Sequence, residues 1–426
     1  MKNFIYTILI FSLFILSIGR DYYEISLSSG VDLRNRIVGA RLLNDNKDPY
    51  LYKWKKGDSE KLVDINDNNI NKVNKVTIPP SLLFIIKKVS LFEYGYIRIA
   101  WFIFTYLMLL FIILSFYFIS TNLQKINILI IGVIFITTVP AWYLHIERGQ
   151  NYIIYIFLMT VSFIFTKFNY LKTSSFFIAL NCWIRPNTLS FIIGNYIHEI
   201  NNFKLLNILK DKKNTYFIYY LLLFILISLT YISPSIWKSY SISNKAWAEY
   251  HLNNDNLIKV TNFNMTDYPQ NIENKHSSYY LVMSLEISNE NLSIQKMLFR
   301  VFNFKLGIFE MILLYLIFLF MLIKILNKSD TSLENKYLSG FLCYILSEYF
   351  LPVPRYHYNS VQWIFPILIM FSNPIKDNIS NFLLCLSFVL VLPISEKIPY
   401  NLSLAELILF ITVIYYIKHK DKDYIS

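Results

Sequence analysis

The chain has 426 residues, of which 55% are hydrophobic, 18% are aromatic and only 16% are charged. A soluble domain carries about a quarter charged residues, and the mean hydropathy here is +0.41. This composition excludes a disordered protein and a cytosolic enzyme, and it favours an all-α polytopic membrane protein. The formal net charge is +12, from 40 Lys and Arg residues against 28 Asp and Glu residues.

Apolar runs recur along the chain, and a membrane-spanning helix needs about 20 mainly apolar residues. The runs predict about twelve transmembrane helices, at residues 4–19, 96–119, 126–144, 151–166, 173–185, 187–200, 215–234, 304–324, 337–352, 359–373, 380–394 and 401–417. The first run resembles a signal peptide, but we favour a retained helix because no small-x-small cleavage site precedes Asp21.

The predicted helices divide the chain into membrane and loop regions. They are a first transmembrane helix at 1–19, a first extracytoplasmic loop at 20–95, transmembrane helices two to seven at 96–234, a large extracytoplasmic loop at 235–302, transmembrane helices eight to twelve at 303–417 and a cytoplasmic tail at 418–426.

Lysine and arginine differ in their predicted positions. Cytoplasmic loops are enriched in basic residues, and the lysines satisfy this rule when both termini are cytoplasmic. All nine arginines then lie at or near the outer face. Since arginine binds phosphate through paired N–H groups, this asymmetry indicates an anionic ligand outside. For Arg20, Arg98 and Arg300 the alternative is that they are anchors at helix ends.

The sequence predicts no metal site. The three cysteines, Cys182, Cys343 and Cys385, lie in apolar runs without a C-x-x-C spacing. We expect them to be buried small hydrophobic residues, with neither a disulfide nor zinc. The acidic stretch 64–67 lies in an Asn- and Lys-rich segment that we interpret as a solvated loop.

The first outer loop contains a predicted helix that begins beside Asp32. Leu33, Ile37, Ala40 and Leu43 recur at helical spacing behind this residue. An N-cap is the simplest role for an Asp at such a position.

Two further features follow in the same loop. Asp48, Pro49 and Tyr50 predict a turn. Pro79 and Pro80 precede an amphipathic segment, 82–89, that predicts a helix lying at the membrane interface.

Three short outer loops concentrate polar side chains between apolar runs. They are 145–151 (His-Ile-Glu-Arg-Gly-Gln-Asn), 183–187 (Trp-Ile-Arg-Pro-Asn) and 352–359 (Pro-Val-Pro-Arg-Tyr-His-Tyr-Asn). Amide side chains carry a donor and an acceptor together and suit sugar hydroxyls. Loop solvation and helix capping are the alternative for the first of these loops.

The order of these elements resembles a known family, the polyprenyl-phosphate-sugar-dependent glycosyltransferases of the GT-C superfamily, specifically glycosyltransferase family 87. The matching elements are Asp32, Arg36, Gly39, Asp48-Pro49-Tyr50, Pro79-Pro80, Gly149-Gln150-Asn151 and Arg185-Pro186. The resemblance covers residues 1–200, and beyond them only the hydropathy and the Arg-Tyr-His-Tyr stretch. The chain departs from the family at Arg185, where lysine is frequent, and at Ile78, where tyrosine is frequent.

The resemblance implies a GT-C fold of about twelve helices with a helical first outer loop. It implies an integral membrane enzyme that transfers a hexose, commonly mannose in this family, from a polyprenyl phosphate to a glycan or glycolipid acceptor outside the cytoplasm. The reaction would invert the anomeric carbon with one carboxylate as the general base, and it would use no metal, no cofactor and no nucleic acid.

The resemblance also assigns residues. Asp32 would be the catalytic base. The donor phosphate would be bound by Arg148, Arg185, Arg355, Arg36 and His357. The sugar or the acceptor would be bound by Tyr50, Gln150 and Asn151, with Glu147 beside them orienting Arg148.

Two other functions remain open from the sequence. A transporter or flippase for a lipid-linked saccharide would have a similar number of helices, although ionisable residues inside the predicted spans are few, Glu310 and Glu348 among them. A lipid-linked saccharide ligase or polymerase would place its chemistry in a large late outer loop. The segment 235–302 is long enough for this and is rich in aromatic residues, which could equally form an interfacial belt.

Overall fold

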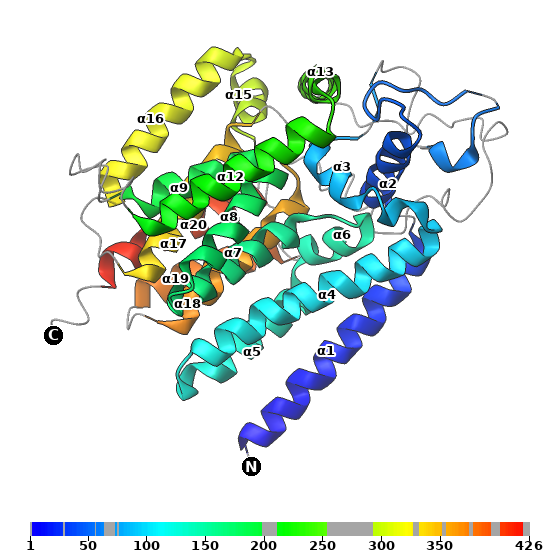
Figure 1. The fold of residues 1–426 in the computed structure, drawn as a ribbon. Helices are drawn as coiled ribbons and strands as arrows, with labels where there is room; N and C mark the ends of the chain where they lie inside the picture. The colour runs from blue at the N-terminus through cyan, green and yellow to red at the C-terminus, as the bar shows by residue number, and fades with distance from the viewer. Residues whose placement is uncertain are drawn as a thin grey trace.

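The computed structural model describes residues 2–28, 30–55, 57–63, 73–74, 76–197, 211–253, 293–326, 332–351, 355–374, 378–392 and 401–420. Within these ranges the protein is all-helical and has no strand (Figure 1). The all-α fold class is therefore confirmed. The acidic stretch 64–67 and most of the predicted large loop, 254–292, lie outside the described residues.

The first outer loop folds into short helices beside the end of a long one. These elements are α1 (Lys2–Leu27), α2 (Val31–Asn44), η1 (Glu60–Leu62), α3 (Pro80–Ile86) and η2 (Val89–Leu91). The predicted helix behind Asp32 is present as α2. It packs on α3 through a small apolar core that includes Ala40 and Leu83.

Two long antiparallel segments follow, α4 (Tyr94–Ile119) and then α5 (Asn122–Thr138) with α6 (Pro140–Arg148). The sequence predicts one helix over 126–144, whereas the structure bends by 65° between α5 and α6. Proline lacks a backbone N–H and clashes with the preceding turn, so Pro140 begins a new helix. The bend directs Arg148 toward α2.

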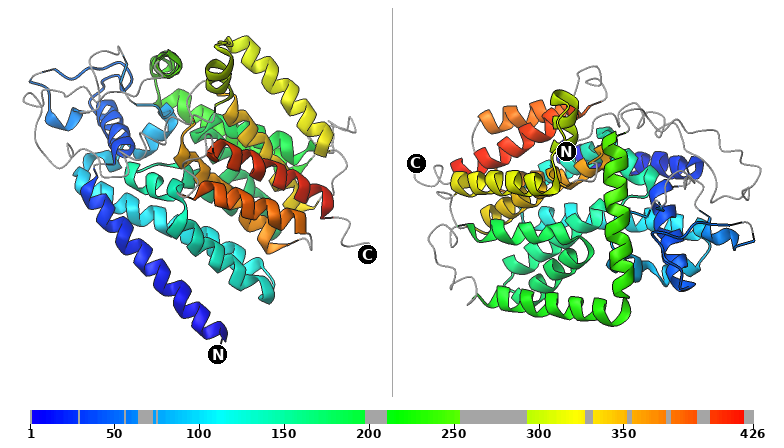
Figure 2. Two further views of the ribbon diagram at one scale, coloured as in Figure 1. Left: turned by 180° about the vertical axis from the view of Figure 1, so that it is seen from behind. Right: turned by 90° about the horizontal axis from the view of Figure 1, so that it is seen from above.

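The rest of the chain forms the body of the bundle. Its elements are α7 (Tyr152–Lys167), α8 (Leu171–Ile184), η3 (Pro186–Thr188), α9 (Leu189–Asn195), α12 (Lys212–Tyr231), α13 (Pro234–Asn253), α15 (Ile294–Phe302), α16 (Ile308–Leu326), α17 (Leu333–Tyr349), η6 (His357–Trp363), α18 (Ile364–Ser372), α19 (Asn378–Val391) and α20 (Asn401–His419). The segment predicted as a polar loop from residue 235 begins as α13, which lies across the end of the bundle in the view from above (Figure 2).

Helix α17 forms the centre of the bundle. Every residue from 337 to 346 is buried, and α9, α16, α18 and α20 contact this helix. By contrast, α12 and α16 expose large apolar side chains such as Leu229, Phe309 and Phe320. Apolar outer surfaces of this kind suit a lipid environment.

Four described helices are long and apolar enough to cross a membrane: α4, α12, α16 and α20. The bent pair α5 and α6 would make a fifth. Other predicted spans form shorter helices, such as α8 with 14 residues and α18 with nine. The membrane-compatible helices support the membrane class, while the number of twelve spans stays a prediction.

The cysteines are only partly as expected. Cys182 and Cys343 are buried, and both are free thiols, as predicted. Cys385 on α19 is also free, but it is exposed, so the expectation of burial was wrong there. An apolar run predicts a helix without telling which face of that helix lies inside the bundle, and Cys385 lies on the outer face.

Helices α7, α8 and α17 run along the bundle, and polar side chains gather at both ends of these helices. One end contains Arg148, Arg185 and Glu348, near the end of α6, the end of α8 and the end of α17. The other end contains Lys167 and Lys213, where α7 ends and α12 begins. We call the first the Asp32 end, because α2 packs there, and the second the Lys213 end.

Candidate functional site

The candidate site is centred on Asp32, in the first turn of α2. Its carboxylate accepts hydrogen bonds from Nε and Nη2 of Arg148, at 2.5 Å and 3.2 Å, and from Nε2 of Gln150 at 2.5 Å. The side chains of Asp32 and Arg148 are 20% and 21% exposed. The ion pair is therefore partly exposed at the surface of the protein.

Gln150 connects Asp32 to Arg36, one turn further along α2. Arg36 donates through Nη2 to Oε1 of Gln150 at 2.6 Å and through Nη1 to the Gly149 carbonyl at 2.8 Å. One side of the amide thus faces a guanidinium and the other faces a carboxylate, which fixes its orientation. Arg36 consequently acts on the site by positioning Gln150.

The corner between α6 and α7 depends on Gly149 and Arg98. Gly149 has φ of 66°, in the left-handed region that glycine adopts readily. A Cβ at this position would lie 2.5 Å from Cβ of Leu33. Arg98, which is buried on α4, donates to the carbonyls of Ile146 at 3.0 Å and Glu147 at 2.5 Å. These contacts bring the corner close enough to α2 for the ion pair to form.

Aromatic rings join this part of the site to a second arginine. The guanidinium of Arg148 lies 5.5 Å from the ring centre of Tyr358, whose ring packs 5.7 Å from that of Tyr152. Arg185 lies 4.8 Å from the ring centre of Tyr152 and 4.7 Å from that of Tyr155. Contacts of this kind stabilise a cation and fix the plane of its guanidinium.

Two buried carboxylates pair with the remaining arginines. Arg185 donates to Oε1 of Glu348, from Nε at 2.8 Å and also from Nη2. Arg355 lies between Glu348, at 3.4 Å, and Glu406, at 2.7 Å. The side chain of Arg185 is 18% exposed, whereas that of Arg355 is only 2% exposed. Arg185 is therefore the more accessible of the two cations.

The charge of Arg355 is secured by its neighbours. Burial alone would lower its pKa, but the carboxylates of Glu406 and Glu348 raise it, so that the pKa lies above its ordinary value. Removing one partner from a buried pair leaves an uncompensated charge. Arg355 thus forms ion pairs with both carboxylates. The pair with Glu348 helps to hold the carboxylate to which Arg185 also binds.

Tyr50 and Asn151 were both predicted to bind sugar or acceptor. Tyr50 is fully buried in the core of the first outer loop, where its hydroxyl donates to the Ile78 carbonyl at 2.8 Å. Asn151 is buried at the start of α7 and donates to the hydroxyl of Tyr155 at 2.6 Å. Tyr50 belongs to the scaffold of the loop, while Asn151 reaches the aromatic bridge beside Arg185.

His357 and Glu147 complete the predicted set. His357 is buried in η6, and burial lowers its pKa to about 3, so it is uncharged at neutral pH. An uncharged imidazole gives a phosphate at most one hydrogen bond and no charge. Glu147 is buried at the end of α6, where its carbonyl accepts from Arg98.

Some of the site residues were not predicted from the sequence, namely Glu348, Glu406, Tyr152, Tyr155 and Tyr358. The signal for both glutamates was present, because each lies in an apolar run and an intramembrane carboxylate is rare unless it is functional or paired. Tyr358 lies in the Arg-Tyr-His-Tyr stretch already identified in the sequence, whereas no comparable signal marks Tyr152 and Tyr155 in a chain with 33 tyrosines.

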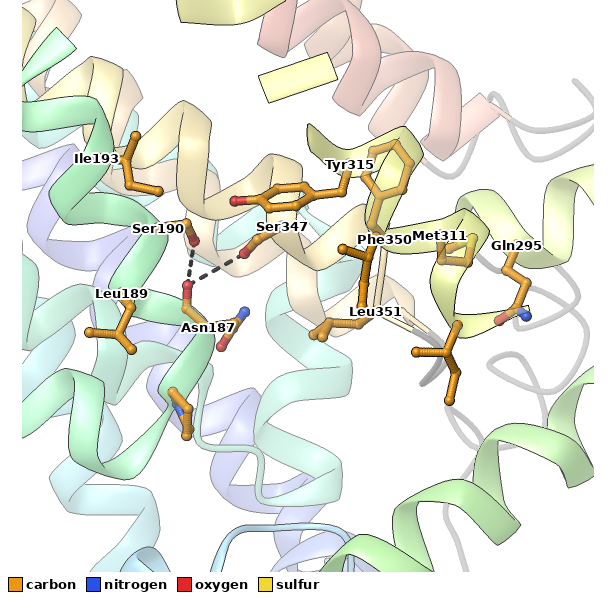
Figure 3. A pocket seen from close by; sticks show the side chains of 13 residues that line it. Asn187, Leu189, Ser190, Ile193, Gln295, Met311, Tyr315, Ser347, Phe350 and Leu351 are labelled. Carbon is orange, nitrogen blue, oxygen red and sulfur yellow. Dashed lines mark hydrogen bonds between the residues drawn. The ribbon is translucent and has the colours of Figure 1, made fainter. Parts of the chain in front are cut away.

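An apolar cavity of about 590 Å³ lies beside the Arg185–Glu348 pair. Figure 3 shows the side chains that line it, which come from η3, α9, α15, the first turns of α16 and the end of α17. Asn187 lines it and also donates to Glu348 at 3.3 Å. Ser347 donates to the Asn187 carbonyl at 3.4 Å. An apolar chamber thus lies directly next to a charged centre.

The charges of the site do not cancel. Its four arginines face three carboxylates, so one formal positive charge is in excess; the residues are Arg36, Arg148, Arg185, Arg355, Asp32, Glu348 and Glu406. In the described part of the chain, no group of three or more His, Cys, Asp or Glu side chains could bind a metal ion. The arrangement offers a carboxylate and two guanidiniums, each about one fifth exposed, beside an apolar cavity.

Three comparisons with known proteins were made. The scan against protein-family models, the search of curated proteins and the search of solved structures each found no match. The functional argument therefore depends on the geometry of the site and on the resemblance of the sequence motifs.

Proposed function

We propose that the protein is an integral membrane glycosyltransferase that moves a hexose from a polyprenyl-phosphate sugar to a glycan or glycolipid acceptor. The observation that carries the proposal is the Asp32 carboxylate, oriented by Arg148 and Gln150, within one connected network that leads to Arg185 and the apolar cavity. A base, a phosphate ligand and a chamber for a lipid chain are the parts that this reaction needs.

Asp32 would accept the proton of the acceptor hydroxyl. The described donors occupy both lone-pair positions of Oδ2 and one of Oδ1, and a carboxylate has about four such positions. Oδ1 is therefore the atom available to the acceptor. Because the two bonds from Arg148 hold the carboxylate plane fixed, this atom has a defined direction.

The reaction is a single displacement. The acceptor oxygen forms a bond to the anomeric carbon as its proton passes to Asp32, and the bond from that carbon to the phosphate oxygen breaks with its electron pair leaving on the phosphate. A single displacement inverts the anomeric carbon, in contrast to retaining glycosidases, which use two carboxylates in two steps.

The leaving phosphate would be stabilised by Arg148 and Arg185. Arg148 uses two of its five N–H groups on Asp32 among the described residues, so donors remain for a ligand. Arg185 is partly exposed, and its guanidinium contacts the rings of Tyr152 and Tyr155. Arg355, which lies enclosed between Glu348 and Glu406, supports Arg185 indirectly.

The isoprenoid chain of the donor would enter the cavity beside Asn187. The lining is mainly apolar, with Leu189, Met311 and Phe350 among its residues. Pockets for small ligands are predominantly apolar with a few oriented polar groups, and this cavity has that character. A lipid chain in this cavity would lie beside the Arg185–Glu348 pair, next to the arginine proposed to bind its phosphate.

The experiment is transfer from labelled polyprenyl-phosphate sugars in isolated membranes. Asp32→Asn should lower transfer at least 100-fold, because a positioned general base contributes about 10²–10⁴-fold. Asp45→Asn, an exposed position at the other end of α2, is the matched control and should retain activity. Full activity of Asp32→Asn would overturn the proposal.

The finer topology belongs to the same proposal: twelve spans in a GT-C arrangement, both termini in the cytoplasm and the Asp32 end outside. The same assay separates the alternatives. A transporter would move the intact donor across the membrane without releasing polyprenyl phosphate. A ligase would require a lipid diphosphate and would not use the monophosphate donors.

A further inference from the structure

A second cavity, of about 220 Å³, lies at the Lys213 end of the bundle. It opens where α7 ends and where α8, α12 and α17 begin, and thus at the opposite ends of the helices that carry Arg185 and Glu348. Its volume is below the range of about 300–1,000 Å³ that is typical of drug-sized ligands. A single small polar group fits this volume better than a whole metabolite.

Two lysines and one aspartate line the cavity. Nζ of Lys213 donates to the hydroxyl of Tyr337 at 3.2 Å and lies 4.8 Å from the centre of its ring. Lys336, the residue directly before Tyr337 on α17, also lines the cavity. The carboxylate of Asp211 is already engaged, since it accepts from the backbone of Lys213 and from the hydroxyl of Tyr196, each at 2.9 Å.

A further acidic group close to this end is neutralised by other cations. Glu334, at the start of α17, pairs with Lys167 at 3.4 Å and with Lys420 at 3.6 Å. The lining itself carries two lysines against one aspartate, so it has one positive charge in excess. The electrostatic balance of the cavity therefore favours an anion.

The backbone adds to this preference. Helices α8, α12 and α17 have 14, 20 and 17 residues, and all three begin around the cavity. The N-terminus of a helix carries a partial positive charge and unpaired N–H groups that favour anions. Three such termini meet here. Asp211 caps one N–H group of α12 and Ser332 caps one of α17, and α8 has no side-chain cap.

Asn195 supplies an independent sign of a ligand. It is 7% exposed and lines the cavity, and its amide oxygen has no hydrogen-bond partner among the described residues. As it stands this oxygen is an acceptor, but the oxygen and nitrogen of an amide are assigned from the surrounding network; with the amide turned over, its NH2 group takes this position and can donate to an anion. A buried polar atom without a partner is costly, and a bound ligand would satisfy it.

A hydroxyl network fixes the far wall of the cavity. Four hydrogen bonds of 2.6–2.9 Å connect hydroxyl groups from three helices: Ser162 and Thr166 on α7, Ser174 on α8 and Tyr337 on α17. The network joins three helices and places the Tyr337 hydroxyl where Lys213 donates to it. The ammonium group of Lys213 is thereby held in position at the edge of the cavity.

We propose that this cavity is a binding site for the phosphate group of an anionic ligand, at the end of the bundle opposite Asp32. Lys213 and Lys336 provide charge, the helix termini provide N–H donors and Asn195 provides an amide donor. The inference does not depend on glycosyl transfer. A free phosphate and a phospholipid headgroup share this chemistry, and binding measurements distinguish them.

The test uses the purified full-length protein in a neutral detergent. Inorganic phosphate and a short-chain phosphatidylglycerol are titrated separately and followed by calorimetry, with a short-chain phosphatidylcholine as the zwitterionic reference. Binding of inorganic phosphate would show that the free anion is sufficient to occupy the site, without a lipid. Binding of phosphatidylglycerol without binding of phosphate identifies a lipid headgroup. If neither anion binds, or if phosphatidylcholine binds equally well, the proposal is overturned.

Variants locate the binding. Lys213→Met should weaken the affinity for the anion at least tenfold, whereas Lys212→Met should change it less than twofold, because Lys212 is an exposed neighbour outside the cavity lining. If Lys213→Met does not fold, Lys336→Met serves in its place and should also weaken binding. Equal effects of Lys212→Met and the lining variants would show general attraction to a basic surface and would overturn the site.

Discussion

Glu348 receives more side-chain hydrogen bonds than its place in an apolar run suggests. Arg185, Asn187, Tyr344, Arg355 and Gln362 all donate to its two oxygens. The carboxylate is 1% exposed, so these bonds replace its hydration almost completely. A buried charge is tolerated only when it is paired and hydrogen-bonded in this way.

We expect Glu348→Gln to destabilise the protein strongly. Loss of the negative charge leaves Arg185 and Arg355 buried with one carboxylate fewer, and breaking a buried pair typically costs about 3–5 kcal/mol. Thermal unfolding in detergent measures the effect. Glu310→Gln is the matched control, because Glu310 is exposed at the start of α16 and its substitution should shift the midpoint little. A small shift for Glu348→Gln would contradict the ion-pair network.

His357 makes stability depend on pH. Its pKa is lowered by burial to about 3 in the folded protein, against about 6.5 when unfolded. The unfolded chain therefore binds the additional proton between these values, so His357 contributes its stability fully above pH 6.5 and loses it as the pH falls toward 3.

The expected size of this effect follows from linkage. One proton corresponds to about 1.4 kcal/mol per pH unit, so lowering the pH from 7.5 to 5.0 should cost the parent protein about 2 kcal/mol more than His357→Gln. Thermal unfolding of both proteins at the two pH values gives the comparison. Parallel pH dependence would show that His357 is not held neutral.

At this scale the sequence predicted the cations better than their partners. The arginine asymmetry singled out Arg148, Arg185 and Arg355, and the structure brings all three to the Asp32 end. Glu348 lies 163 residues from Arg185, and Glu406 lies 51 residues from Arg355. Such pairings are set by how helices pack, which residue type and local spacing do not determine.

Helices α9 and α17 approach each other closely through two glycines. A Cβ on Gly340 would lie 2.8 Å from the Phe191 carbonyl, and a Cβ on Gly194 would meet the backbone of Ser339. Small residues permit such backbone contact between membrane helices. The contact sets the distance between η3 and the end of α17, and therefore the position of Asn187 beside the cavity.

We expect Gly194→Ala to separate these helices and to destabilise the protein by about 1–3 kcal/mol, the usual cost of overpacking. The obstacle is backbone, which cannot rotate away as a side chain can. Gly95→Ala is the matched control, since nothing lies within 4 Å of a Cβ at that helical position. Thermal unfolding should distinguish the two variants, and equal midpoints would disprove the close contact.

Most helices of the described chain were predictable from hydropathy, because apolar runs such as 96–119 and 401–417 coincide with α4 and α20. Breaks and crossings were less predictable. Pro140 lies inside the predicted helix 126–144, and only the packed structure shows that the chain bends there by 65°. The polar composition of α13 predicts a loop, but it forms a helix of 20 residues that packs on α3.

The short loops between the bundle helices separate the two kinds of cation. Arg148, Arg185 and Arg355 gather at the Asp32 end, while Lys167 and Lys213 lie at the opposite end. The positive-inside rule assigns the lysine-rich end to the cytoplasm. In the proposed topology the two cavities would face opposite sides of the membrane, and ligands would reach them from different compartments.

This orientation can be tested with single cysteines. In a parent protein whose exposed Cys385 is replaced by alanine, Asp45→Cys reports on the Asp32 end and Lys212→Cys on the Lys213 end, because both positions are exposed. A membrane-impermeant thiol reagent should label Asp45→Cys in intact cells and Lys212→Cys only after permeabilisation. Cys182 and Cys343 are buried and should stay unlabelled in the folded protein. Labelling of Lys212→Cys alone in intact cells would show the reverse topology. The Asp32 site would then lie in the cytoplasm, contrary to the positive-inside rule.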